Sequence, residues 1–179
     1  KFWESKNNIL TILLIPFSIL FYFLISLRKT FLNPKKFKIP IICVGNIYVG
    51  GTGKTPVSLM IANNLKINKK NPAIIKKYYK NQEDEHRLIS KITSCLILNK
   101  NRVAALEKAE RENFDVGILD DGFQDHRIKK NLNIICFNSK QLDGNSLVFP
   151  AGPLRESLSS LKRAQIVIIN GEKNKSFEE

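Results

Sequence analysis

IPIICVGNIYVGGTGKTP, residues 39–56, decides the fold class of this chain. An apolar run that predicts a buried strand leads into a glycine-rich loop, and a helical pattern follows the loop. Backbone N–H groups in such a loop can bind phosphate oxygens, and the N-terminus of the next helix also favours anions. The stretch therefore predicts a phosphate-binding loop, and its expected nucleotide-binding residues are Gly50, Gly51, Thr52, Gly53, Lys54 and Thr55.

Two side chains at the end of this loop have the chemistry that a nucleotide requires. We expect Lys54 to contact the outer phosphates and Thr55 to bind Mg²⁺ through its hydroxyl. The strict motif has a glycine five residues before Gly53, where this chain has Tyr48. The alternative is a glycine-rich turn without a ligand.

The composition favours a folded domain with polyanionic partners. The chain has 179 residues, of which 43% are hydrophobic, and its formal net charge is +13 from 29 basic and 16 acidic residues. Such a charge is typical of proteins that bind nucleotides, nucleic acid or anionic membranes, although much of the lysine could be solvated surface. No basic patch is interleaved with aromatic residues, so we expect no nucleic-acid partner. The chain begins without methionine and ends in a polar tail, which is typical of a fragment.

Three cysteines, Cys43, Cys95 and Cys136, lie far apart, each in an apolar run. We expect them to be reduced core residues, not a disulfide framework or a metal site.

Ile9–Leu27 is a run of 19 residues without a charge. As a helix it would cover most of the ~30 Å hydrocarbon layer of a bilayer. Thr11, Ser18, Tyr22 and Ser26 fall on one side of that helix, which also suits a helix lying in the membrane interface. A third alternative is a buried core helix. Basic residues follow the run, and they favour the cytoplasmic side of a membrane. We therefore expect a membrane-associating segment at 1–32 and a second domain at 33–179.

Downstream of the loop, short apolar runs alternate with helical or polar segments. This alternation predicts an α/β fold with a mostly parallel sheet flanked by helices, as in P-loop NTPases. The expected strands are Ala73–Ile75, Cys95–Leu98, Val116–Leu119, Ile134–Phe137 and Ile166–Ile169; the expected helices are Asp84–Lys91 and Arg102–Glu112, the latter with Asn101 as N-cap.

FDVGILDDGFQ, residues 114–124, carries the second chemical signal. The predicted strand delivers Asp120 and Asp121 to its C-terminal end, where open α/β sheets bind their ligands. A carboxylate at this place is the usual second ligand of nucleotide-bound Mg²⁺. Asp-Asp-Gly is also good turn chemistry, so a simple turn is the alternative.

The third stretch, LVFPAGPLRESLSSLKR at 147–163, predicts a stiff loop that presents Arg155 and Glu156 before a short helix. Together, VGNIYVGGTGKTP, DDGFQ and PAGPLRE resemble the tetraacyldisaccharide 4'-kinases, the lipid A 4'-kinases of Gram-negative bacteria. That family also lacks the first glycine of the loop. The resemblance implies a P-loop kinase at the cytoplasmic face of the inner membrane. It would transfer the γ-phosphate of ATP to the 4'-hydroxyl of an acylated disaccharide 1-phosphate lipid.

The resemblance also implies roles for individual residues. Asp120 and Asp121 match the family's metal-site aspartates, and Gln124 and Glu156 match further active-site positions, with Glu156 a metal ligand. Asp84 resembles the group that activates the sugar hydroxyl, with an ordinary helix N-terminal acid as its alternative. The implied catalytic residues are Asp84, Lys54, Asp121 and Gln124; Arg102 resembles a basic residue near the phosphates.

Three departures from the family pattern stand out. The expected Ser-Arg-Gly-Tyr segment appears here as Lys76-Lys77-Tyr78-Tyr79. Asp125 stands where many members have histidine, so His126 is only a candidate site residue, and His86 is expected at the surface. Family members also continue into a second lobe. The alternatives to a lipid kinase are therefore an inactive ATP-binding fragment and a membrane-tethered P-loop NTPase.

Overall fold

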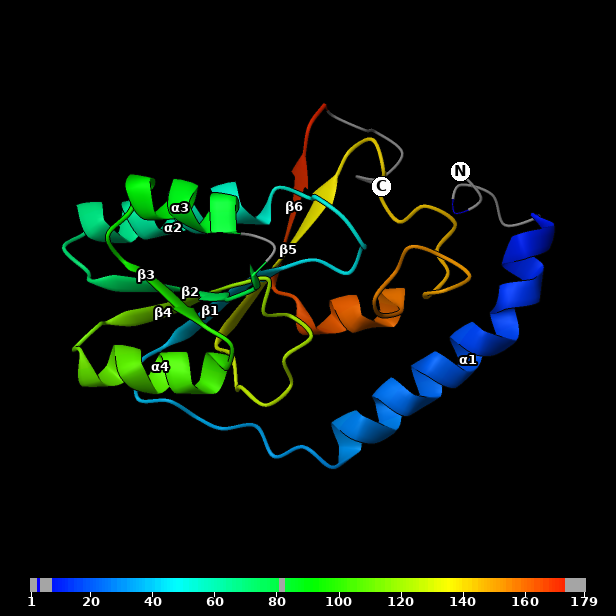
Figure 1. The fold of residues 1–179 in the computed structure, drawn as a ribbon, viewed down its shortest axis with the longest axis horizontal. Coiled ribbons are helices and arrows are strands. Elements are labelled where there is room, and N and C mark those ends of the chain that lie inside the picture. Colours follow the sequence, from blue (N-terminus) through cyan, green and yellow to red (C-terminus); the bar gives the residue numbers. More distant parts are fainter. Residues whose placement is uncertain (1–2, 4–7, 81–82, 173–179) are drawn as a thin grey trace. The chain divides into compact units, whose positions relative to one another are not determined.

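The structure is a computed structural model that describes residues 3, 8–80 and 83–172 (Figure 1). Its helices and strands follow one another in the order α1 (Ile9–Thr30), β1 (Ile41–Gly45), α2 (Lys54–Ile67), β2 (Pro72–Lys77), α3 (Glu83–Ile92), β3 (Leu96–Asn99), α4 (Arg102–Arg111), β4 (Val116–Asp120), β5 (Leu132–Asn138), the 3₁₀ helix η3 (Leu158–Arg163) and β6 (Ile166–Asn170). Every strand and helix expected from the sequence is present, with bounds that shift by a few residues. Asn101 caps α4 as predicted, because its side chain accepts a hydrogen bond from the N–H of Val103.

The chain divides into two compact units. The first takes its described residues from Lys1–Asn33, Asn46–Gly53 and Ile135–Glu179, and the second comprises Pro34–Gly45 and Lys54–Ile134. Each unit is a set of residues that contact one another, which is a different criterion from membrane association. The expected division into a membrane segment at 1–32 and a kinase domain at 33–179 therefore stays a prediction.

Six strands form one sheet in the order β3-β2-β4-β1-β5-β6, and β5 begins in the second unit and ends in the first. The pairs β2–β3, β2–β4 and β1–β4 are parallel, which confirms the predicted sheet type. Within the second unit, α2 contacts β1, β2 and β4, and α4 contacts β2 and β3 (Figure 1). Figure 1 shows α2 and α3 on one face of these strands and α4 on the other, as expected for strands buried on both faces.

The core of the second unit consists of strand residues and the helix residues that cover them. All five residues of β4 are buried, and so are four of the five in β1. Leu106 of α4 is fully buried against this layer and lies close to Gly117, whose position leaves room for it. The three cysteines are buried with free thiols, as predicted.

In the first unit, α1 is a helix of 22 residues that is long and apolar enough to cross a membrane. Only 11% of its most apolar window is buried, which disfavours the core-helix alternative. Two of its polar residues, Thr11 and Ser18, are buried. Ser18 Oγ donates to the carbonyl of Val148 (2.8 Å) and accepts from the N–H of Ala151 (2.9 Å). This part of the predicted polar stripe therefore anchors the loop at 145–153.

The packing around Gly117 gives a direct test of the fold. A Cβ at this position would lie 2.7 Å from Leu106 Cδ2 and 3.0 Å from Ile41 Cδ1. We expect Gly117→Ala to lower the free energy of unfolding by about 1–3 kcal/mol, because overpacking forces these side chains to move. Gly51→Ala is the matched control, since nothing lies within 4 Å of the added methyl group. Thermal or urea unfolding of both variants measures the difference, and equal stabilities would contradict the packing described here.

Candidate functional site

Residues 46–53 form the loop between β1 and α2, and two asparagines hold its shape within the first unit. Asn46 is fully buried, and its side-chain amide donates to the carbonyls of Tyr48 (2.7 Å) and Gly50 (3.2 Å). Asn170, at the end of β6, donates to the carbonyl of Thr52 (2.6 Å). Neither asparagine was among the predicted site residues. Asn46 lies inside the quoted VGN stretch, whereas only the fold brings Asn170 to the loop.

Two glycines of this loop adopt conformations that other residues avoid. Gly50 has a φ of 146° and Gly53 a φ of 79°. At Gly53 a side chain would also collide with the amide of Asn170, since a Cβ would lie 2.6 Å from Nδ2. Both glycines are therefore required by the shape of the loop.

The loop leads directly into α2, which belongs entirely to the second unit. Thr55 Oγ1 and Asp120 Oδ2, at the end of β4, are 2.9 Å apart. Lys76 of β2 joins them, with its Nζ 2.7 Å from the same carboxylate oxygen and 3.3 Å from the hydroxyl. We call Thr55, Lys76 and Asp120 the triad. Two of its members were predicted to lie together, whereas Lys76 was noted only as a departure from the family pattern.

Lys54 and Asp121 lie beside the triad in the sequence and pair with each other. Lys54 Nζ is 3.7 Å from Asp121 Oδ1, and the lysine side chain is 12% exposed. Asp121 has a φ of 59°, a left-handed conformation that is uncommon outside glycine. Its N–H donates to the carbonyl of Val44 (2.9 Å), which fixes the turn after β4 to the end of β1. The DDGF stretch therefore forms a turn, and the metal role of its two carboxylates stays a prediction.

Arg102, at the start of α4, contacts the same turn. One guanidinium nitrogen donates to the carbonyl of Asp121 (2.7 Å), and another lies 3.9 Å from Asp125 Oδ2. Asp125 also accepts two hydrogen bonds from Arg127 (2.9 and 2.7 Å). Burial raises the pKa of Asp125, but the hydrogen bonds and charge of Arg127 outweigh it and hold that pKa below its ordinary value. Asp125 therefore supplies a fixed negative charge beside Arg102.

The remaining predicted residues of the second unit lie near the turn or on α3. Gln124 and His126 are half-buried in the turn, and their roles stay predictions. Asp84 is exposed in the first turn of α3 and forms no hydrogen bond or ion pair with the triad within the described part of the chain. Its catalytic role therefore stays a prediction too.

The expectation that His86 lies at the surface is wrong. Its residue is only 4% exposed, and its ring centroid lies 5.4 Å from that of Tyr78. The residue shares the buried face of α3 with Ile89, three positions later, which is 3% exposed. That i, i+3 spacing was the signal that would have placed the histidine inside.

Glu156, the predicted metal ligand in the third stretch, lies in the first unit and is 3% exposed. Its Oε2 accepts from Lys29 Nζ (2.7 Å), in the last turn of α1, and from Arg163 (2.5 Å), at the end of η3. In this structure Glu156 therefore joins α1 to the loop that follows Pro153.

The donor types at the triad fit a magnesium ion. A hydroxyl and a carboxylate are oxygen ligands of the kind Mg²⁺ prefers, and the position already attracts the ammonium of Lys76. Within residues 3, 8–80 and 83–172, no group of three or more His, Cys, Asp and Glu side chains is placed to hold a metal. A cation at the triad would therefore need further oxygen ligands, which nucleotide phosphates and water commonly provide.

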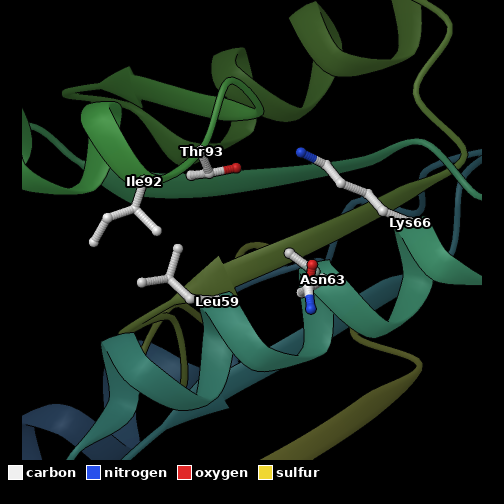
Figure 2. A pocket seen from close by; sticks show the side chains of 6 residues that line it. Leu59, Asn63, Lys66, Ile92 and Thr93 are labelled. Atoms are coloured by element: carbon white, nitrogen blue, oxygen red, sulfur yellow. The ribbon is translucent and has the colours of Figure 1, made fainter.

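A small cavity lies elsewhere in the second unit, between α2 and the end of α3 (Figure 2). It has a volume of about 130 Å³, and its lining residues are Leu59, Ala62, Asn63, Lys66, Ile92 and Thr93. No predicted site residue lines it, so this cavity is distinct from the predicted phosphate site.

Known proteins resemble the chain over almost its whole length. It is 44% identical over 174 residues to the tetraacyldisaccharide 4'-kinase of Pelagibacter ubique, covering 96% of this chain and 54% of that protein. It is 34% identical to the tetraacyldisaccharide 4'-kinase of Haemophilus influenzae, covering 97% of this chain and 59% of that protein. The chain thus spans somewhat more than half the length of these relatives.

A solved structure shows the same fold. The "apo" form of LpxK from Aquifex aeolicus, crystallised in complex with ATP, superposes with a TM-score of 0.78 at 31% sequence identity. The match covers 90% of this chain and 59% of that one. A family model described as tetraacyldisaccharide-1-P 4'-kinase matches residues 10–93 and 83–179. Because these matches together extend over nearly the whole sequence, the chain belongs to the tetraacyldisaccharide-1-P 4'-kinase family.

Proposed function

We propose that this chain carries the nucleotide-binding part of a lipid kinase. The kinase would transfer the γ-phosphate of ATP to the 4'-hydroxyl of tetraacyldisaccharide 1-phosphate, a step of lipid A biosynthesis. The observation that carries the proposal is the placement of Lys54 and Thr55, at the start of α2, next to the carboxylates of Asp120 and Asp121. Loop, lysine, hydroxyl and strand-end carboxylate are the parts that a P-loop kinase uses to bind ATP with Mg²⁺.

Each of these residues has a chemical role in the proposal. Thr55 Oγ1 and Asp120 would hold Mg²⁺, and Asp121 and Glu156 remain proposed further ligands. The bound ion would neutralise negative charge on the phosphates. Lys54 would bind the outer phosphates, with Asp121 orienting its ammonium at 3.7 Å. Arg102, which already donates to the turn after β4, would contribute a second positive charge near the phosphates.

Acceptance of the sugar proton is assigned to Asp84. Its side chain is exposed, so it is accessible to a hydroxyl group of a bound substrate. Gln124 is proposed to bind or orient reacting groups from the turn after β4.

The properties of α1 support the proposed lipid substrate and the proposed location at a membrane. Apolar side chains cover most of its surface, including Leu20 and Phe23, which are 56% and 60% exposed. Arg28 and Lys29 occupy its last turn. An exposed apolar helix that ends in basic residues suits a membrane with anionic headgroups. We infer that α1 attaches the chain to the cytoplasmic face of the inner membrane, where the lipid substrate resides.

The first test concerns ATP binding. Lys54→Ala removes a charged donor to phosphate, so we expect the Kd for ATP to rise by about 10- to 100-fold. Lys66→Ala is the matched control, because this exposed lysine lies in the last turn of the same helix. Isothermal titration calorimetry on both variants measures the effect. An unchanged Kd for Lys54→Ala would contradict the phosphate-loop assignment.

The second test concerns phosphoryl transfer. We expect Asp84→Asn to lower the rate of labelled phosphate transfer to the disaccharide lipid by about 10²–10⁴-fold, since a general base would be lost. ATP binding should stay unchanged, because the proposed role involves only the acceptor hydroxyl. Glu83→Gln is the control from the same turn of α3. If the parent chain binds ATP with Lys54 but transfers no phosphate, the ATP-binding fragment is the better description.

The third test concerns the membrane. Leu20→Asp places a charge in the middle of α1 and should cost about 2.5–3.5 kcal/mol if that helix is inserted. We therefore expect a clear loss of partition into vesicles that contain anionic lipid, measured by flotation. Met60→Asp is the control, because Met60 is 54% exposed but belongs to α2. Equal partition of both variants would count against attachment through α1.

A further inference from the structure

Lys76 holds a cation where the proposed function places Mg²⁺. Its Nζ lies 2.7 Å from Asp120 Oδ2 and 3.3 Å from Thr55 Oγ1. These two oxygen atoms are themselves 2.9 Å apart. The ammonium is therefore within hydrogen-bond distance of both groups that would bind the metal.

The backbone of the sheet creates this arrangement. Lys76 and Asp120 are register partners on the adjacent parallel strands β2 and β4, so their side chains emerge side by side on one face. Both are shielded from solvent, with side chains 10% and 1% exposed. Asp120 Oδ1 also lies 3.5 Å from the hydroxyl of Ser58, which fixes the carboxylate further.

An ammonium and a divalent cation make competing demands on these oxygen atoms. Lys76 donates hydrogen bonds to the lone pairs that a metal would need. Two cations that close together would also repel each other strongly in a site with little solvent. Both cannot occupy the triad in the geometry seen here.

We propose that Lys76 is a tethered cation that competes with Mg²⁺ for Asp120 and Thr55. It neutralises the buried carboxylate when no metal is bound, and it must be displaced for Mg²⁺ to bind. This inference rests on the proposed function, because it concerns the metal position of the same site. The expected consequence is weak binding of divalent cations by the nucleotide-free protein.

The plain alternative is a structural ion pair. A buried carboxylate needs a partner in any protein, and a lysine on the neighbouring strand would suffice. A purely structural role predicts that Asp120 and Thr55 bind no divalent cation even without the lysine, so Lys76→Gln would gain no metal affinity. The affinity for a divalent cation therefore separates the two roles.

The test compares Lys76→Gln with Lys77→Gln, using Mn²⁺ as a paramagnetic probe. Lys77 is the matched control: it follows on the same strand, and its ammonium lies 5.1 Å from the ring centroid of Tyr79. Electron paramagnetic resonance measures free Mn²⁺ during titration of the nucleotide-free protein. We expect Lys76→Gln to bind Mn²⁺ at least about tenfold more tightly than the parent chain, because the competing charge is gone.

Two further variants sharpen the result. Lys76→Arg keeps the positive charge and should bind Mn²⁺ as weakly as the parent chain. Thr55→Ala combined with Lys76→Gln should lose the gain in affinity, because one of the two ligands is missing. Equal affinity of the parent chain and Lys76→Gln would overturn the proposal, and so would a gain of the same size in Lys77→Gln.

Loss of the buried pair could also unfold the protein, and circular dichroism in EDTA detects this. If Lys76→Gln is unfolded in EDTA, Mn²⁺ should restore its folded spectrum, because the metal replaces the lost cation. No recovery with Mn²⁺ would overturn the proposal. In either case the control Lys77→Gln should stay folded in EDTA.

Failure of this inference can be told apart from failure of the proposed function. ATP binding that depends on Lys54, together with Mn²⁺ affinities indifferent to Lys76, would overturn the tethered cation alone. A Lys76-dependent Mn²⁺ affinity without any ATP binding would support the tethered cation and reject the nucleotide site.

Discussion

The parallel pairing of β1 with β4 is the constraint on which the candidate site depends. Its register sets Val44 opposite Asp120, so the loop after β1 and the carboxylates after β4 leave the sheet at the same edge. The hydrogen bond from Asp121 N–H to Val44 carries the ladder one residue further and fixes the left-handed turn. A shift of one residue would turn the side chain of Asp120 to the other face of the sheet. Register, more than any single contact, therefore determines where the acidic groups lie.

Two buried carboxylates, one in each unit, are paired with cationic side chains. Asp120 is almost completely buried, and a carboxylate there is tolerated because Lys76 and two hydroxyl groups surround it. In the first unit, Glu156 is buried in the same way between Lys29 and Arg163. Both carboxylates were expected as metal ligands, and in this structure both are already neutralised by side chains of the chain itself. Some of the 29 lysines and arginines thus have specific anionic partners within the fold.

Local patterns predicted the fold well because each strand is an apolar run and each boundary has turn or cap chemistry. Thr55 and Asp120 were expected to lie close together because the phosphate loop and the DDGFQ stretch each follow a predicted strand of one parallel sheet. The contact of Lys76 with Asp120 could not be predicted, because it depends on which strand lies next to β4. Local sequence patterns do not specify strand order. His86 was misplaced for a related reason: a single polar residue was judged by its type instead of by its spacing to Ile89. The contacts of Ser18 needed the position of a loop some 130 residues later.

The hydrogen bond from Asn170 to Thr52 has a consequence for folding of the chain during its synthesis. The two residues are 118 positions apart, yet the amide of Asn170 holds a carbonyl of the phosphate loop at 2.6 Å. A ribosome synthesises the loop early and Asn170 late, so the nascent chain passes through a long interval in which the loop lacks this hydrogen bond. The loop gains this hydrogen bond only after β6 has left the ribosome. Contacts of such high sequence separation form slowly, and completion of the loop is therefore coupled to completion of the sheet.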